Sequence, residues 1–421
     1  MNTCLRHWLT PLLILPLIAC IELNDHDDAS HTPEEDINEQ YAATITGNTN
    51  ANELIHGVAI YIDYPDEPAL VTPTQLDNML NNMGYQEPGI ERSFRKYWHQ
   101  QSRGNVDLSH DVFFYTAPQS AAYYRGEQFT YEDSNLLWQQ ALEWVEANHP
   151  NYNWDALSTN DDGTLTAVMY ISSAWGIAGV GGGHGVNWTL NNGVKANLIQ
   201  VSILSPSWND THNLFMPLHE AAHQVFRLPD TYDTDYSSGG TSVYSLMSGG
   251  DPEVEPIGGP FLHLLGWGHS ILPLPGTQTI TLQADGEQVL VYKNPLDENE
   301  FFTIEARKQS TLGNQDFPAP LGLLIWHSDE NITTSNTQEF MTPNSHYRHA
   351  IEQADGLFEL ELGPAGVSQN MGDIYLPGKV FSDNTSPSAN WWDGSTSGFE
   401  ISDIELLDDD QVRFKMSVPP L

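Results

Sequence analysis

The chain has 421 residues, of which 39% are hydrophobic, so it is long enough to bury the core of one large domain or of two medium ones. Its 56 Asp and Glu residues against 15 Lys and Arg residues give a formal net charge of −41. Because a surface this negative repels phosphate groups, nucleic acid and anionic lipid headgroups are not expected as partners.

Residues 1–19 have the pattern of a secretion signal peptide. Arg6 precedes an apolar run over residues 8–19, which is too short for a mature membrane-spanning helix. The run ends in Leu17-Ile18-Ala19-Cys20, which resembles the bacterial lipoprotein box and implies cleavage before Cys20 and lipidation of its thiol. Ile21, in place of Asp, favours the outer membrane. We therefore expect a lipid-anchored protein of the cell envelope or exterior, and the alternative is an ordinary signal peptide.

Cys4 and Cys20 are the only cysteines in the chain. Once the signal peptide is removed, only Cys20 remains and lipid would block it, so no disulfide is expected. Residues 20–53 are polar and acidic, which predicts a flexible tether between the lipid and the folded part. The alternative interpretation of this stretch is an inhibitory pro-segment.

From residue 54 onward the hydrophobic pattern is that of a globular protein. Apolar runs predict strands over residues 58–62 and 166–172, and amphipathic patterns predict helices over 93–102 and 131–148. After a short predicted helix at 261–267, a two-residue alternation predicts strands at 279–283, 288–292, 301–306, 321–326 and 412–418. The sequence thus predicts an α+β protein, with one domain over residues 54–270 and a β-rich C-terminal subdomain over 271–421.

The central motif is His219-Glu220-x-x-His223 within an apolar helix that is predicted to stop at Pro229. Two histidines four residues apart lie on one helical face, where both imidazoles can bind one Zn²⁺ ion. Glu220, between them, is the expected general base toward a metal-activated water. The alternative is a surface helix with two unrelated histidines.

Downstream residues supply candidates for the rest of a zinc site. Asp230 follows the helix stop and is the predicted third ligand, with Glu253 or Glu255 next in line. Asp233 and Asp235 could hold Ca²⁺, and a solvated acidic loop is the alternative. Met247 lies in a predicted tight turn and could form an apolar floor below the metal, or simply be a core methionine. Tyr232 and Tyr244 are candidates for stabilising the oxyanion.

These residues resemble a known family. The segment from His219 to Asp233, followed by Leu246-Met247-Ser248-Gly249-Gly250, is similar to the immune inhibitor A family of secreted bacterial zinc metallopeptidases. The resemblance implies a metzincin-like catalytic domain with a Met-turn at Met247, and it assigns the third-ligand role to Asp230. The family commonly has a glycine three residues after the second histidine and the aspartate three beyond it. Here Phe226 takes the glycine position and Asp230 comes one residue late.

Other notable residues are expected to be structural. His327, Asp329, His346 and His349 lie far from the motif and show no ligand spacing, so we predict that they pack in the core. Trp391 and Trp392 could bind the face of a sugar, but anchoring a loop is the preferred interpretation.

Together these patterns predict a secreted, lipid-anchored and monomeric zinc endopeptidase that acts on proteins or peptides and meets the membrane through its N-terminal lipid only. The alternative is a surface-displayed binding protein on the same fold that has lost its chemistry.

Overall fold

The computed structural model describes residues 43–46, 53–87, 92–126, 131–174, 177, 182–184, 188–196, 199–203, 214–235, 237–248, 256–284, 288–309, 319–333, 336, 341–363 and 370–420. Of residues 43–46, 131–134, 182–184 and 199–203 it describes the backbone alone. Across these residues the fold is mixed α+β, with sheets of six, five, four and two strands.

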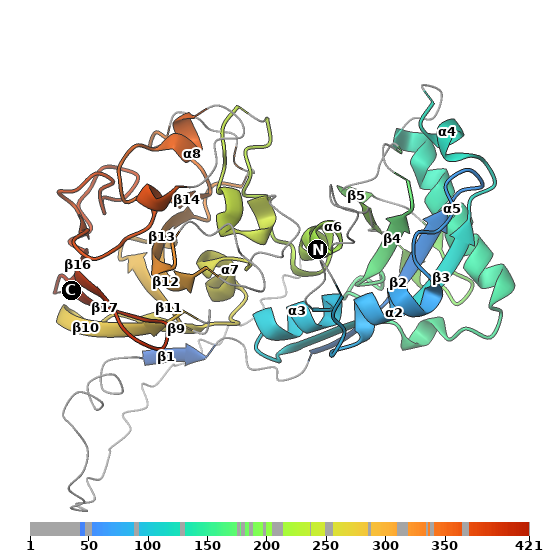
Figure 1. Cartoon of the computed structure of the whole chain (residues 1–421), viewed down its shortest axis with the longest axis horizontal. Helices are drawn as coiled ribbons and strands as arrows, with labels where there is room; N and C mark the ends of the chain where they lie inside the picture. Colours follow the sequence, from blue (N-terminus) through green and yellow to red (C-terminus); the bar gives the residue numbers. More distant parts are fainter. Residues whose placement is uncertain are drawn as a thin grey trace, which may run out of the picture. The chain divides into compact units, whose positions relative to one another are not determined.

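The five-stranded sheet has the order β3-β2-β4-β8-β5, with β2 lying between β3 and β4 (Figure 1). Its strands are β2 (Glu53–Asp63), β3 (Val106–Thr116), β4 (Val168–Ser172), β5 (Gly182–His184) and β8 (Ile199–Ile203). Strands β3, β2, β4 and β8 are parallel, and β5 pairs antiparallel with β8. The strands predicted at 58–62 and 166–172 are confirmed, whereas β3 was not predicted. A buried parallel strand is covered on both faces, which explains the unbroken apolar run in β2.

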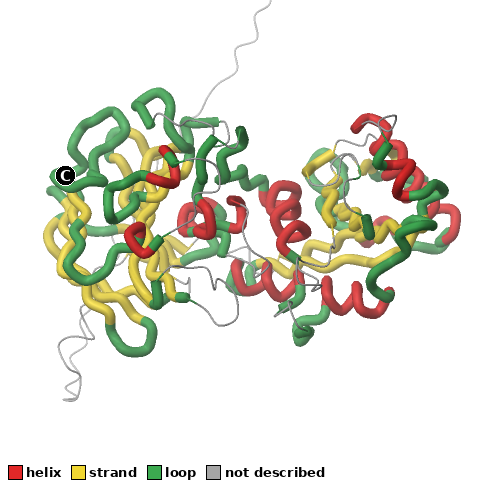
Figure 2. Tube along the Cα trace, turned by 45° about the horizontal axis from the view of Figure 1, so that its top comes forward, coloured by secondary structure: helices red, strands yellow, loops and turns green. Residues whose placement is uncertain are grey.

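Helices cover both faces of this sheet (Figure 2). Ala59 and Tyr61 of β2 belong to the core that contains side chains of α2, α3 and α6, whereas the alternate residues Val58 and Ile60 pack in the core with α5. The helices are α2 (Pro73–Asn81), α3 (Phe94–Gln101), α4 (Ala121–Tyr124), α5 (Tyr131–Asn148) and α6 (Phe215–Phe226). The predicted helices at 93–102 and 131–148 are thus confirmed.

The C-terminal half contains two further sheets around a third core. The six-stranded sheet has the order β1-β9-β11-β12-β13-β14, and the four-stranded sheet has the order β10-β17-β16-β15. The strands of the first are β1 (Ala43–Thr46), β9 (His269–Leu272), β11 (Gln288–Asn294), β12 (Asp297–Lys308), β13 (Leu321–Asp329) and β14 (His349–Ile351). Those of the second are β10 (Gly276–Gln283), β15 (Phe381–Ser382), β16 (Glu400–Leu406) and β17 (Gln411–Val418). All five strands predicted in this half are present.

One part of the predicted tether is ordered. Ala43–Thr46 forms β1, which pairs antiparallel with β9. The segment ATIT is rich in β-branched residues, which favour extended backbone over a flexible coil. Four residues of the stretch predicted as a tether are thus in a strand, and the flexible tether stays a prediction.

The remaining elements are short. They are η1 (Trp154–Ala156), β6 (Trp188–Thr189), β7 (Lys195–Ala196), η2 (Ser242–Tyr244), η3 (Leu246–Ser248), α7 (Gly259–Leu264), α8 (Glu359–Leu362) and η4 (Met371–Asp373). The helix expected at 261–267 is α7, which begins two residues earlier and ends at Leu264. Among the described helices, none has the length and apolar content needed to cross a bilayer.

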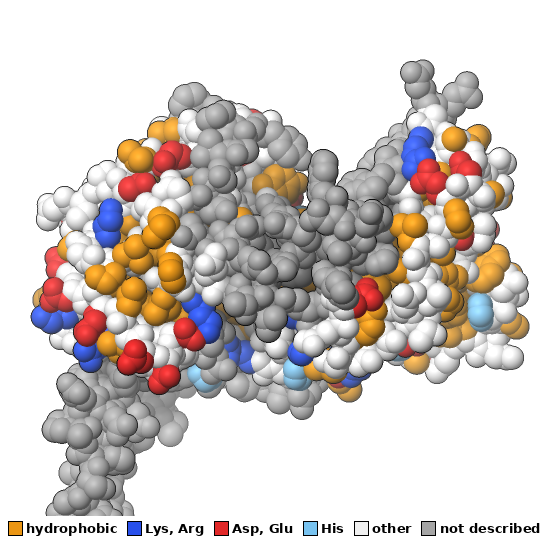
Figure 3. All heavy atoms as spheres, in the orientation of Figure 1, with side chains coloured by type: hydrophobic (Ala, Val, Ile, Leu, Met, Phe, Trp, Pro, Cys, Tyr) orange, Lys and Arg blue, Asp and Glu red, His pale blue; other side chains and the backbone are white. Residues whose placement is uncertain are grey.

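The surface carries few cations, and several of them are neutralised by acidic neighbours. Figure 3 shows several Lys and Arg side chains beside Asp and Glu side chains. Ion pairs join Arg95 to Asp107, Arg125 to Glu67, Arg348 to Glu330 and Arg413 to Glu405. Paired cations offer little attraction to phosphate groups.

Candidate metal centre

Helix α6 is held in place by its apolar face. Leu218, Ala221 and Ala222 are buried in one core with Met247. The side-chain amide oxygen of Gln224 accepts a hydrogen bond from the backbone N–H of Val168 at 3.1 Å, which ties the helix to β4. The helix therefore cannot rotate without breaking buried contacts, and its histidine face has a defined direction.

The helix ends earlier than predicted. Its last residue is Phe226, and Arg227 has left-handed backbone angles of φ 60° and ψ 28°, so the chain turns before it reaches Pro229. The ring of Phe226 lies 4.6 Å from that of Trp98 and 4.8 Å from that of Trp267. This aromatic packing keeps Phe226 in the helix and moves the left-handed turn to Arg227.

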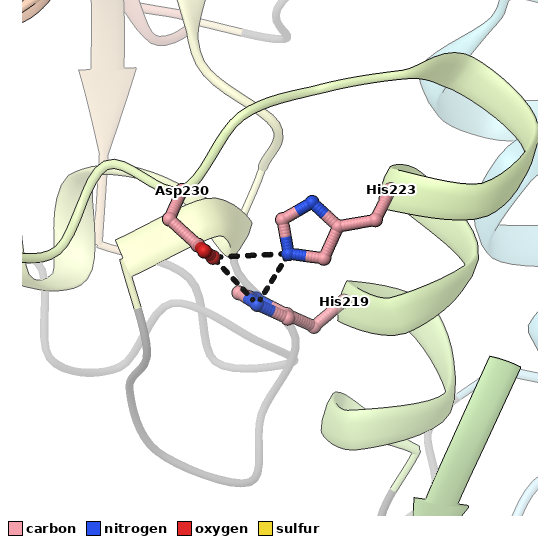
Figure 4. Close-up of side chains that lie close together, drawn as sticks. All are labelled: His219, His223 and Asp230. Carbon is pink, nitrogen blue, oxygen red and sulfur yellow. Dashed lines mark hydrogen bonds and ion pairs between the residues drawn. The ribbon is translucent and has the colours of Figure 1, made fainter. Parts of the chain in front are cut away.

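Beyond that turn the chain brings Asp230 back to the helix, as Figure 4 shows. One carboxylate oxygen of Asp230, Oδ1, lies 3.0 Å from Nε2 of His219 and 3.0 Å from Nε2 of His223. The two Nε2 atoms are 3.2 Å apart. The three side chains predicted as metal ligands therefore converge on one point.

The opposite nitrogens of both rings are engaged with backbone carbonyls. Nδ1 of His219 donates to the carbonyl of Leu246 at 2.9 Å, and Nδ1 of His223 donates to the carbonyl of Leu228 at 2.6 Å. A carbonyl can only accept, so each Nδ1 carries the proton and each neutral ring has its lone pair on Nε2. Among the described residues, Oδ1 of Asp230 accepts no hydrogen bond. Three electron-rich atoms thus face one another, which is the arrangement that a cation stabilises.

Protons on the two Nε2 atoms can occupy the same place as a metal ion. Burial alone raises the pKa of Asp230, but contacts with protonated His219 and His223 outweigh it and hold that pKa well below its usual range. Burial lowers the pKa of His223, but Asp230 more than offsets this, so the pKa of His223 is raised. A metal ion would compete with a proton for His223.

The donor set fits zinc. Ligand atoms bound at about 2.0–2.1 Å in a tetrahedron lie about 3.3–3.4 Å apart, a few tenths of an ångström more than the separations found here. Two imidazoles and one carboxylate are a common protein share of a zinc site that keeps a fourth position for water. His219 is 6% exposed and Asp230 is half-buried, and the converging oxygen Oδ1 of Asp230 is itself buried.

Glu220 is adjacent in sequence to one member of this triangle. It follows His219 on α6 and is 5% exposed. Its charge contributes to raising the pKa of His223. A buried carboxylate next to a metal position is suited to accepting a proton from bound water.

The loop that carries Asp230 is clamped by hydrogen bonds from distant segments. The N–H of Thr231 donates to the carbonyl of Met247 at 2.7 Å, and the N–H of Thr241 donates to the carbonyl of Thr231 at 2.9 Å. The side-chain amide of Asn336 also donates to the carbonyl of Thr231, at 2.9 Å. Gly240 makes this crossing possible, because a Cβ there would lie 2.5 Å from Cα of Tyr232. Part of this clamp comes from the half predicted as a separate subdomain.

Met247 is fully buried in η3 and shares the core of α6. Its neighbour Leu246 orients His219 through a carbonyl, so the turn contributes its backbone to the candidate site.

The two tyrosines suggested for the oxyanion differ. Tyr232 is half-buried, and its ring centroid lies 6.3 Å from that of His219. Tyr244 is fully buried and donates its hydroxyl to Asp373 at 2.9 Å. Of the two, Tyr232 is therefore the one beside the candidate site.

Asp233 and Asp235, suggested for calcium, have other partners. Oδ2 of Asp233 accepts from the hydroxyls of Ser237 and Ser238 at 2.7 Å each, and from the N–H of Ser238 at 2.6 Å. Asp235 accepts from the N–H of Ser237 at 3.0 Å. These bonds account for the burial of Asp233 without an ion, and calcium at this position stays a prediction.

His327, His346, Trp391 and Trp392 are packed together. Trp392 stacks on the rings of His327, at 4.6 Å, and His346, at 4.0 Å, with interplanar angles of 10° and 11°. Trp391 stacks on Tyr292 at 5.5 Å. The predicted structural role of these residues agrees with this packing.

Several predicted residues lie outside the described part of the chain, namely Cys4, Cys20, Glu253 and Glu255. Sequence reasoning also missed residues that matter. Gly240 and Asn336 hold the ligand loop, but nothing in their local sequence marks them for this role. No model of a known protein family matches the chain, and no curated protein matches it.

Proposed function

We propose that this protein is a zinc-dependent endopeptidase that resembles the immune inhibitor A family and has a metzincin-like catalytic part. The observation that carries the proposal is the convergence of His219, His223 and Asp230 at 3.0–3.2 Å, with both Nδ1 atoms bound to carbonyls. A structural ion-pair network would have no need to point two lone pairs and a carboxylate at one another.

The residues have distinct roles in the proposed reaction. Zn²⁺ bound to the three ligands would lower the pKa of a water toward neutrality and polarise the scissile carbonyl. Glu220 accepts the proton of the attacking water and passes it to the leaving amine. The carbonyls of Leu246 and Leu228 keep both imidazoles in the tautomer that presents Nε2. Tyr232, next to His219, is our candidate for a hydrogen bond to the developing oxyanion.

The late position of Asp230, which departs from the family pattern, is compatible with the proposal when the left-handed residue at the helix end is taken as the reference point. The family glycine and the aspartate are three residues apart, and glycine suits a left-handed turn. Here the left-handed residue is Arg227, and Asp230 is three residues beyond it. The helix is one residue longer because Phe226 packs between two tryptophans, and the spacing from turn to ligand is retained. On this basis we propose Met247 as the Met-turn residue, below the metal.

We further propose that the protein is attached to the cell envelope through lipid on Cys20, as the N-terminal pattern suggests. Its negative surface is compatible with attachment by lipid alone, because anionic headgroups would repel it.

The deciding experiment measures zinc and peptide hydrolysis in the purified protein. Wild type is expected to hold one zinc per chain and to cleave casein. Glu220→Gln preserves the shape but removes the base, so zinc content should stay while kcat falls by about 10²–10⁴-fold. Glu53→Gln, which alters an exposed carboxylate at the start of β2, serves as the matched control and should change neither.

The outcomes separate the alternatives. A zinc-loaded wild type without hydrolysis would favour the inactive binding protein. A Glu220→Gln variant with full activity would exclude Glu220 as the base.

A further inference from the structure

A second group of carboxylates lies outside the candidate zinc centre. Asp355 follows β14, Glu359 begins α8, and Asp373 ends η4. Each offers one oxygen, and these three oxygens lie within 4.8 Å of one another. None of the three residues forms an ion pair with Lys or Arg within the part of the chain that the structure describes. Within the described residues, their charges therefore lack a directly paired cation.

Asp373 gives the group a buried, unused acceptor. The residue is 1% exposed. Its Oδ2 accepts from the hydroxyl of Tyr244 and from the N–H of Asn370, both at 2.9 Å. Its Oδ1 is buried and accepts nothing from the described residues, and Oε2 of Glu359 is in the same situation. Buried carboxylate oxygens without a donor are costly, and a cation would satisfy them.

The backbone makes room for these side chains to meet. A Cβ on Gly372 would lie 2.0 Å from Oδ2 of Asp355 and 2.6 Å from Oδ1 of Asn370. Only glycine can stand there while Asp355 points inward. Asn370 also donates from Nδ2 to Oε1 of Glu359 at 3.2 Å, which fixes that carboxylate.

Without a cation, this arrangement is unfavourable. Burial, together with the charges of Asp355 and Glu359, raises the pKa of Asp373 to about 6. Asp355 and Glu359 are only half-buried, so the open side of the group can supply water ligands.

We propose that Asp355, Glu359 and Asp373 bind a calcium ion. All the donors are oxygens, which suit a hard cation rather than zinc. Ca²⁺ takes several carboxylates in a flexible geometry, whereas Mg²⁺ keeps most of its waters and is usually held by one or two carboxylates. A group of three carboxylates therefore favours the larger ion.

The position of the ion suggests what it stabilises. Asp373 binds the hydroxyl of Tyr244, and Tyr244 lies two residues before Leu246, whose carbonyl orients His219. An ion on Asp373 would hold this carboxylate in its charged form and keep the hydrogen bond from Tyr244. Binding itself does not depend on the proposed peptidase activity.

Terbium luminescence tests the site directly, because Tb³⁺ replaces Ca²⁺ and is excited through a nearby tyrosine such as Tyr244. The full-length protein, stripped with a chelator and kept in excess Mg²⁺ to mask weak surface binding, is titrated with Tb³⁺ and then with Ca²⁺. We expect a saturable signal that Ca²⁺ displaces, and a Ca²⁺-dependent rise in the midpoint of thermal unfolding. The double variant Asp355→Asn with Glu359→Gln should bind at least 10-fold more weakly and lose the thermal shift.

Two controls locate the ion. Asp233→Asn removes the carboxylate that the sequence had suggested for calcium and should leave the signal unchanged. His219→Ala with His223→Ala removes the candidate zinc site and should also leave it unchanged, which separates this proposal from the peptidase. Near-ultraviolet circular dichroism confirms that each variant is folded. Unchanged Ca²⁺ affinity in the folded double variant, or no saturable signal in wild type, would overturn the proposal.

Discussion

Two of the places where buried histidines meet carboxylates in this molecule are built differently. At the candidate metal centre, His219 and His223 give their Nδ1 protons to backbone carbonyls and turn both Nε2 atoms toward one oxygen of Asp230. At His327, each ring nitrogen has its own carboxylate, Glu352 and Glu300, at 3.1 Å. In the first arrangement both Nδ1 protons go to carbonyls, so neither neutral ring has a proton to donate to Asp230. In the second, a charged His327 has one proton for each carboxylate.

The difference teaches how to tell a ligand set from an ion-pair network. Burial and short distances are common to both, since His327 is 2% and His219 6% exposed. What differs is where the protons go. An imidazole with a carboxylate at each ring nitrogen is stable as imidazolium, while a cation can stabilise two imidazoles whose lone pairs converge.

The largest expected effect is on zinc binding, from Asp230→Asn. An amide is a weaker ligand than a carboxylate, so we expect zinc affinity to fall at least 10²-fold, more than the 10–100-fold typical for losing an outer-shell partner. Competition with a chelator of known affinity measures this.

Asp329→Asn is the matched control, because Asp329 also contacts a histidine ring, His346 at 3.2 Å, without convergence. Its zinc affinity should match wild type. If Asp230→Asn kept its zinc, the third ligand would have to be sought at Glu253 or Glu255.

His327→Gln should act on stability instead of zinc binding. We expect zinc content and hydrolysis to be unchanged, and the free energy of unfolding to fall by about 3–5 kcal/mol because two carboxylates lose a buried partner. Burial lowers the pKa of His327, but Glu300 and Glu352 outweigh it, so this pKa is raised above 6.5. The stabilisation is therefore fully present below pH 6.5 and is lost as the pH rises through the folded-state pKa.

At low pH, the stabilisation by His327 is limited by protonation of its partner Glu300. Burial raises the pKa of Glu300, but His327 and other donors hold it below 4.5 overall, so its contribution is lost as the pH falls through the folded-state value. The difference between wild type and His327→Gln in denaturant unfolding should thus be greatest between pH 4.5 and 6.5. A difference that did not vary with pH would contradict a charged pair.

The smallest expected effect is on the free energy of unfolding, from substitutions of Arg227 at the end of α6. Arg227 is exposed and left-handed, a conformation that costs about 1 kcal/mol for a residue with a Cβ. Arg227→Gly should raise the free energy of unfolding by up to about 1 kcal/mol. Arg227→Ala, which removes the guanidinium but keeps the Cβ, should show no such gain. Equal stability changes in both variants would argue against relief of backbone strain.

Local patterns predicted much of the fold. The helix carrying the motif, two of the parallel strands and all five C-terminal strands follow from residue periodicity, because hydrophobic spacing reports which face is buried. β3 was missed despite its alternation, and β1 was taken for tether because its four residues gain order only by pairing with β9. The helix end was misplaced by packing, since Phe226 contacts aromatic rings from α3 and from beyond α7.

What the sequence by itself determined is the set of groups that short-range geometry brings together: two imidazoles one turn apart with Glu220 between them. The helical period places them on one face wherever the helix packs. What only the tertiary structure decided is the direction of the ring nitrogens, the arrival of Asp230 and the meeting of Asp355, Glu359 and Asp373. These depend on carbonyls and carboxylates from segments distant along the chain, and such groups become neighbours only when the cores that carry them have packed.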